Sequence, residues 1–125
     1  MTIQDALTAI GKNKPHSFEN SALIGWLAEL DGMVHKELIL THEHTHEQES
    51  FTPYTGTTST TTVLLVPPPY DQIYLYWLAS KIDYFNLEYD KYSNDQTLFN
   101  NSYLTYSDYY TRTHMPLQNV AQFNL

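Results

Sequence analysis

The stretch from residue 75 to residue 110 repeats large side chains at alternating intervals of three and four residues. The series, called the seam below, consists of Leu75, Leu78, Ile82, Phe85, Tyr89, Tyr92, Gln96, Phe99, Tyr103, Tyr106 and Tyr110. Only a helix places side chains with this spacing on one face, and an average interval of about 3.5 residues makes that face a narrow stripe that packs against another helix. The seam therefore predicts long helices that are covered along one side.

The first half of the seam is aliphatic, whereas the second half is mostly tyrosine. Tyrosine carries a hydroxyl that needs a partner or water, so it suits surfaces that are half buried against another chain. We therefore expect the second half to mediate self-association or partner binding. The residues predicted for this role are Tyr89, Tyr92, Phe99, Tyr103, Tyr106 and Tyr110.

Charge and composition exclude several classes of protein. The 125 residues include 14 acidic and 6 basic side chains, which give a net charge of −8, and no basic cluster. Affinity for nucleic acid comes mainly from Lys and Arg on phosphates, so a nucleic-acid binder is not expected. The absence of cysteine removes disulfides and thiolate metal sites. No signal peptide and no apolar run of about 18 residues is visible, so we expect a soluble cytosolic chain without a membrane partner.

Two helices are predicted in the first 40 residues. Thr2 and Asp5 form a capping-box pattern, and Gly11 is a natural stop for the helix that follows. The second helix begins near Ser17 or Asn20 and continues to about residue 40. Its apolar residues keep helical phase across two internal glycines; they are Leu23, Leu27, Leu30, Val34 and Leu38.

The segment from 41 to 69 is predicted to be mostly irregular. Residues 63–66 are apolar, and Val63 and Val66 are β-branched, which indicates a short strand that pairs with the region around Phe51 in a hairpin. The threonine-rich run at 55–62 is alternatively a loop that becomes ordered on binding a partner. Thr57, Thr58 and Thr60 are therefore candidate docking residues.

A C-terminal helical hairpin is predicted after the prolines at 67–69. We expect the third helix to end near Tyr92 and the fourth to run from about Asp95 to Arg112, because Ser93 and Gln96 form a capping-box pair. Asn86 is a weaker candidate for the break. Asp83, Glu88 and Asp90 are interpreted as a solvated helix face.

The predicted fold is thus mainly α. We expect a compact bundle of about four helices in a single domain spanning 1–116, with a short β-hairpin or loop excursion between the second and third helices. Residues 117–125 are expected to form a C-terminal tail.

A histidine-rich tract provides the only catalytic pattern that we identify. Residues 42–46 read His-Glu-His-Thr-His and match His-Glu-x-x-His. On a helix this spacing places His42 and His46 one turn apart as zinc ligands, with Glu43 as general base and His114 as a further ligand. Because the tract follows a helix end and precedes a polar loop, we favour no catalytic residue, no metal and no cofactor. A small zinc-dependent hydrolase is the alternative function.

Four segments resemble small structural proteins of tailed phages and prophages, in particular the head–tail connector (head-completion adaptor) family. They read LIGWLAELDG at 23–32, LLVPPPYD at 64–71, IDYFN at 82–86 and YTRTHMP at 110–116. The similarity runs from about residue 20 to residue 116. It concerns word patterns and their order, and the histidine tract matches nothing in that family.

The resemblance implies a non-enzymatic adaptor that forms a ring under the capsid portal and lets DNA pass to the tail without specific binding. Its partners would be further copies of itself, the portal protein and a tail-completion or stopper protein, in the virion and, during assembly, in the host cytoplasm. By position, Tyr103, Tyr106 and Tyr110 would pack between subunits. The loop at 55–62 and the tail at 117–125 would meet adjoining rings. Another phage part, such as a tail-completion protein, is an alternative.

Overall fold

The computed structural model describes residues 1–117 and is mainly helical, which confirms the predicted fold class. Four α-helices, α1 (Ile3–Asn13), α2 (Asn20–Val34), α3 (Ile73–Phe85) and α4 (Tyr89–Thr113), account for most of it. A π-helical turn, η1 (His35–Ile39), continues α2, and a short 3-10 helix, η2 (His46–Glu49), follows. Among the residues described, no helix combines the length and the apolar character that a bilayer crossing requires.

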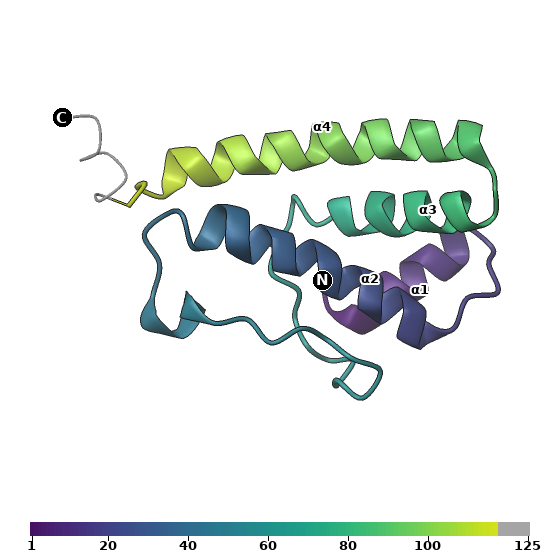
Figure 1. Ribbon diagram of the computed structural model, residues 1–125, viewed down its shortest axis with the longest axis horizontal. Coiled ribbons are helices and arrows are strands. Elements are labelled where there is room, and N and C mark those ends of the chain that lie inside the picture. The colour runs from purple at the N-terminus through teal and green to yellow at the C-terminus, as the bar shows by residue number, and fades with distance from the viewer. Residues whose placement is uncertain (118–125) are drawn as a thin grey trace.

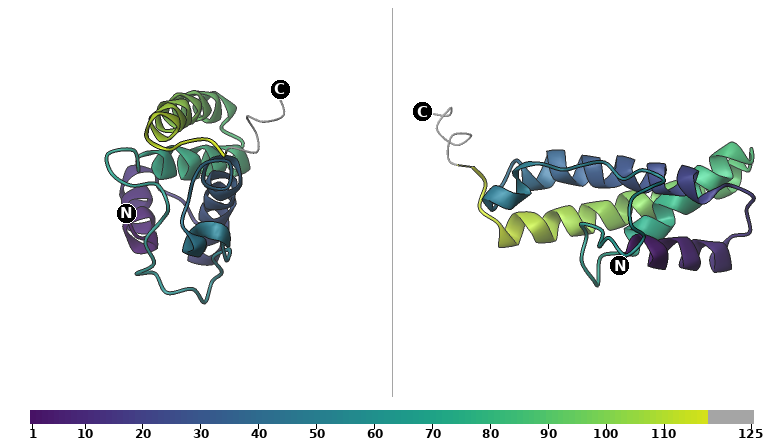
Figure 2. Two further views of the ribbon diagram at one scale, coloured as in Figure 1. Left: turned by 90° about the vertical axis from the view of Figure 1, so that its left-hand side faces the viewer. Right: turned by 90° about the horizontal axis from the view of Figure 1, so that it is seen from below.

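The helices form three layers with α3 in the middle. α4 lies along one side of α3, and α1 and α2 lie side by side on the other, as Figures 1 and 2 show. α4 is longer than α3, and its C-terminal half extends past α3 to reach η1 (Figure 1). The main core lies between α1, α2 and α3, and its fully buried side chains include Ile3, Leu27, Leu30, Leu78 and Ile82.

The predicted start of the first helix is confirmed. The Thr2 hydroxyl accepts from the Asp5 N–H at 3.1 Å and the Asp5 carboxylate accepts from the Thr2 N–H at 3.0 Å, which satisfies two of the free donors at the helix start. Two further N–H groups, those of Ile3 and Gln4, donate to carbonyls of the threonine-rich loop. The helix continues to Asn13, so the prediction of an end at Gly11 is wrong by two residues.

The second helical segment runs from Asn20 to about residue 40, as predicted, although its last turn is π-helical. The π-helical turn widens the backbone just before the histidine tract, and Leu38 and Ile39 within it are buried.

The predicted strand at 63–66 is absent from the described residues. Val63 instead makes an isolated antiparallel bridge with Thr2, and the segment around Phe51 packs on His35 and Tyr54. Leu64 and Val66 are buried, so the apolar run contributes to the core without forming a sheet. The loop excursion that was expected as the alternative to a β-hairpin is what the chain forms.

The predicted break between the last two helices is wrong. Ser93 and Gln96 lie inside α4, and the turn falls at Asn86, Leu87 and Glu88, the weaker of the two predicted positions. The turn is a Schellman motif, because the Glu88 N–H donates to the Asp83 carbonyl at 2.9 Å and the Leu87 N–H donates to the Tyr84 carbonyl at 3.2 Å. Leu87 occupies the left-handed position of this motif, with φ at 61°.

Candidate partner-binding surface

Much of the tyrosine half of the seam is buried within the chain itself. Phe99, Tyr106 and Tyr110 belong to the core. In the antiparallel α3–α4 hairpin the second half of the seam packs on α3, where the rings of Phe99 and Trp77 lie 5.0 Å apart. The expectation that these three residues are covered by another chain is therefore wrong, because the same chain already covers them.

Past the N-terminal end of α3, the last tyrosines of the seam pack on other segments of the chain. The Tyr106 ring lies 5.5 Å from Tyr70, and the Tyr110 ring lies edge-on to His42 at 5.3 Å and stacked on His114 at 3.8 Å. Burial raises the pKa of the Tyr106 phenol to about 12. The Tyr103 hydroxyl donates to the Glu37 carboxylate at 3.0 Å, so this half-buried side chain also has a partner within the chain.

The opposite end of the hairpin carries an exposed aromatic cluster. We call it the turn patch and define it as Tyr84, Phe85, Leu87 and Tyr89, which are exposed, together with Tyr92, which is partly buried. Leu87 is 70% exposed and Tyr89 is 58% exposed, and Tyr84 and Phe85 are at least half exposed. Two of the predicted self-association residues, Tyr89 and Tyr92, belong to this patch.

The rings of the turn patch are held by contacts with the body of the protein. Phe85 stacks on Trp26, with centroids 5.6 Å apart and an interplanar angle of 6°. Tyr84 packs on Tyr92 at 5.5 Å, and the two residues line a pocket of about 260 Å³ together with Lys81 and Gln96. The patch is thus a supported surface, and exposed aromatic clusters of this kind favour binding to another protein.

The left-handed backbone conformation of Leu87 lowers the stability of the isolated chain. The left-handed position of a Schellman motif normally holds glycine, because a Cβ there clashes with the following carbonyl and costs roughly 1–2 kcal/mol. The leucine side chain recovers little of this cost by burial, since it is 70% exposed. A strained apolar residue that points to solvent is explained most directly by a contact outside the chain.

We predict that Leu87→Gly stabilises the isolated chain. Glycine relieves the strain at a φ of 61°, so the free energy of unfolding should rise by about 1 kcal/mol, less any gain in the entropy of the unfolded chain. Urea denaturation followed by circular dichroism measures the change. A loss of stability would mean that the Leu87 side chain serves the fold.

The threonine-rich loop is fastened to the N-terminus. The Gln4 N–H donates to the Thr60 carbonyl at 2.9 Å, the Ile3 N–H donates to the Thr62 carbonyl at 3.0 Å, and the Leu64 N–H donates to the Met1 carbonyl at 2.9 Å. Thr57 is exposed, and Thr58 and Thr60 are partly buried. The loop is therefore attached to the N-terminal segment, and Thr57 is the most accessible of the three predicted docking residues.

The histidine tract does not form the helical arrangement that zinc binding would need. His42 is a buried turn residue whose Nδ1 lies 2.7 Å from the Leu38 carbonyl, while His46 begins η2. Both ring nitrogens of His44 face acceptors, the His42 carbonyl at 2.6 Å and the Glu49 carboxylate at 2.6 Å, which raises the pKa of this imidazole. Within residues 1–117, no three His, Asp or Glu side chains are placed to hold a metal ion.

The histidine tract instead fastens the end of α4. The Glu43 N–H donates to the Met115 carbonyl at 2.7 Å, the Leu117 N–H donates to the Thr41 carbonyl at 3.3 Å, and His42 forms a bridge with Pro116. The rest of the predicted tail, 118–125, lies outside the described residues.

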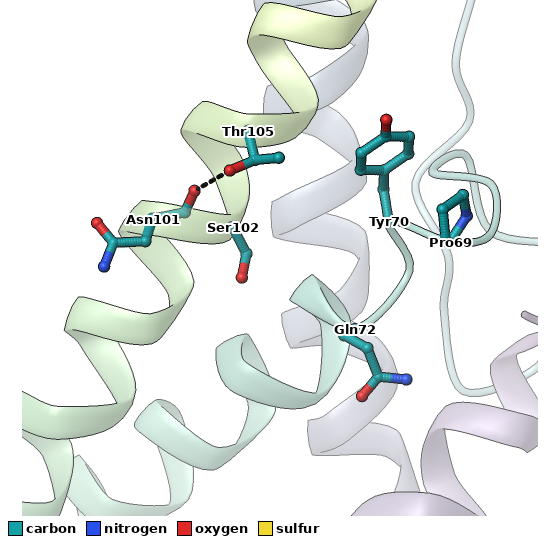
Figure 3. A pocket seen from close by; sticks show the side chains of 6 residues that line it. All are labelled: Pro69, Tyr70, Gln72, Asn101, Ser102 and Thr105. Carbon is teal, nitrogen blue, oxygen red and sulfur yellow. Dashed lines mark hydrogen bonds between the residues drawn. The ribbon is translucent and has the colours of Figure 1, made fainter.

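A second pocket, shown in Figure 3, has a volume of about 320 Å³ and is lined by Pro69, Tyr70, Gln72, Asn101, Ser102 and Thr105. Asn101, Ser102 and Thr105 lie on α4, with the Asn101 amide turned away from Tyr70, and the Thr105 hydroxyl donates to the Asn101 backbone carbonyl at 2.9 Å (Figure 3). These lining residues include no carboxylate, imidazole or amine that could act as a general acid or base near neutral pH.

Comparisons with protein-family models, with curated proteins and with solved structures found no match to this chain.

Sequence reasoning missed part of the turn patch. Tyr84 lies off the seam, and Leu87 lies in a segment predicted to be helical. The signal that points to Leu87 is the helix-ending tendency of Asn86, because Leu87 takes the left-handed position once Asn86 is the C-cap.

Proposed function

We propose that this chain is a non-enzymatic virion assembly protein, a ring-forming adaptor that joins the capsid portal of a tailed phage to the tail and lets DNA pass. The observation that carries the binding role is the turn patch, in which a strained leucine and three exposed aromatic side chains face solvent at one end of the molecule. The phage context rests on the resemblance of four sequence segments.

The charge of the chain fits a conduit for DNA better than a binder of DNA. A net charge of −8 repels the phosphate backbone, so DNA would slide past an assembled ring without being held. The interaction surface would then face protein, which agrees with the aromatic character of the turn patch.

The proposal is tested by measuring the mass of the chain alone and with the portal protein of the same phage, by native mass spectrometry over a range of concentrations. We expect a complex with several copies per portal ring. Leu87→Gly should weaken that complex by at least tenfold, whereas Leu104→Ala, which alters a leucine that is 62% exposed elsewhere on α4, should not. A chain that stays monomeric at every concentration and with portal would contradict the adaptor function.

A further inference from the structure

The start of α4 is held against α1 and α3 by one lysine and two aspartates. Lys14, the C-cap of α1, lies with its Nζ 2.7 Å from Asp83 Oδ1 and 3.5 Å from Asp95 Oδ2. Asp83 belongs to the last turn of α3, and Asp95 belongs to the second turn of α4. Three helices therefore meet at this cluster.

Asp83 is 0% exposed, although the sequence indicated a solvated helix face. Its Oδ1 is bonded to Lys14, but its Oδ2 is buried without a hydrogen-bond partner, and so is Asp95 Oδ2. A buried carboxylate oxygen without a partner is destabilising, and two of them in one cluster with a single ammonium leave a net negative charge.

A proton between the two aspartates removes both problems. The Asp83 and Asp95 carboxyl groups both contact the Lys14 ammonium, and the Oδ2 atom of each is buried without a partner. Two carboxyl groups can form a hydrogen bond with each other only when one of them is protonated. We propose that Asp83 and Asp95 share one proton, and that with Lys14 they form a proton-linked latch that fixes the start of α4 on α1 and α3.

The surroundings of Asp95 support its role as the protonated partner. The ionisable groups that face it are Lys14 from the end of α1 and Asp83 from α3, and the phenol of Tyr76 on α3 lines the same pocket of about 300 Å³. Burial and the neighbouring Asp83 carboxyl raise the pKa of Asp95 to about 6, against the opposing effect of Lys14. For Lys14, burial acts to lower the pKa, but the Asp83 and Asp95 carboxylates outweigh it and raise the pKa, so the ammonium stays charged.

The latch also holds the turn patch. The backbone carbonyl of Asp83 accepts the Glu88 N–H that closes the Schellman motif, so the residue that shares the proton also fixes the turn. A proton at Asp95 tightens the attachment of residues 89–95, and loss of the proton loosens it. The orientation of Tyr89 and Tyr92 thereby depends on pH.

The raised pKa of Asp95 determines whether the stability of the fold rises or falls with pH. Because the pKa of Asp95 is raised in the folded chain from 3.8 to about 6, the stability that the protonated pair provides is fully present below about pH 4 and is lost as the pH rises to about 6. An asparagine at position 95 keeps a donor toward Asp83 at every pH. Asp95→Asn should therefore be more stable than the wild-type chain only at a pH where Asp95 has lost its proton.

The test compares the thermal unfolding of the wild-type chain and Asp95→Asn across this pH range. We expect similar melting temperatures near pH 4, and near pH 8 a melting temperature about 5 °C higher for Asp95→Asn. Asp108→Asn, which removes the same charge from an exposed position of α4, should not show this pH-dependent gain. Asp95→Ala, which lacks a donor for Asp83, should be less stable than Asp95→Asn.

A direct measurement is the titration of the Asp95 carboxyl carbon by NMR, for which we expect a midpoint about two pH units above the ordinary value of an aspartate. Amide hydrogen exchange at residues 89–95, compared at one pH near 8, should be slower in Asp95→Asn than in the wild type. A midpoint near 4, equal melting temperatures near pH 8, or equal stability of the Asn and Ala variants would overturn the shared proton.

Discussion

Replacing Asp31 by alanine is expected to cost roughly 3–5 kcal/mol of the free energy of unfolding. Asp31 is 0% exposed, its Oδ2 accepts from the Tyr54 hydroxyl at 2.6 Å and the Leu65 N–H at 3.0 Å, and its Oδ1 accepts from the Tyr74 hydroxyl at 2.6 Å. Alanine would leave two buried tyrosine hydroxyls and the partly buried Leu65 N–H without this acceptor. Small domains have a total stability of about 5–15 kcal/mol, so much of it would be lost.

The loss should centre on the loop between η2 and α3. Asp31 on α2 is the acceptor that fixes Tyr54 and Leu65, and the Tyr74 hydroxyl that it binds also accepts the Val66 N–H at 2.7 Å. Chemical denaturation measures the cost, and Asp31→Asn is the matched control. Because its oxygen can still accept from two of the donors, we expect about half the cost of alanine. A cost below about 1 kcal/mol for alanine would show that other contacts hold the loop.

The second large effect is expected at the buried part of the seam. Phe99→Ala and Tyr106→Ala should each cost roughly 3–5 kcal/mol, because both side chains are buried within the chain and each replacement leaves a cavity. Tyr89→Ala, at a position that is 58% exposed, should change the stability by about 0.5 kcal/mol or less. The same three variants compare buried and exposed aromatic residues on one helix.

Urea denaturation followed by circular dichroism gives the free energy of unfolding of each variant. Native mass spectrometry measures how well each variant associates with the portal protein. We expect Tyr89→Ala to weaken association while the fold stays intact. If Phe99→Ala and Tyr106→Ala instead leave the stability unchanged and weaken association, the buried seam is an interface between chains.

The sequence predicts the helical class and the positions of most helices because these depend on local periodicity and caps. The capping box at Thr2 and the apolar phase across Gly25 and Gly32 each act within a few residues. Whether the seam tyrosines are buried within the same chain depends on the position of the turn between α3 and α4. A turn at residues 86–88 shortens α3 and lengthens α4, so the tyrosines beyond α3 meet Glu37, His42 and Tyr70.

The turn itself was difficult to predict because leucine occupies a position that usually belongs to glycine. Helix propensity assigns Leu87 to a helix interior, whereas the structure gives it a φ of 61°. Asp83 presents a similar difficulty, since a carboxylate beside polar residues indicates an exposed face. Its burial depends on Lys14, which is 69 residues away in the sequence. Such pairings arise from the tertiary structure and leave no local pattern.

The most direct test of the turn patch as a binding surface is oxidative footprinting of the chain, free and in complex with portal. Labelling of Leu87, Tyr89 and Phe85 should fall severalfold in the complex, because binding would cover side chains that are exposed in the free chain. Labelling of Leu104 serves as the internal reference. Turn-patch residues that are labelled equally in the free chain and in the complex would contradict the account.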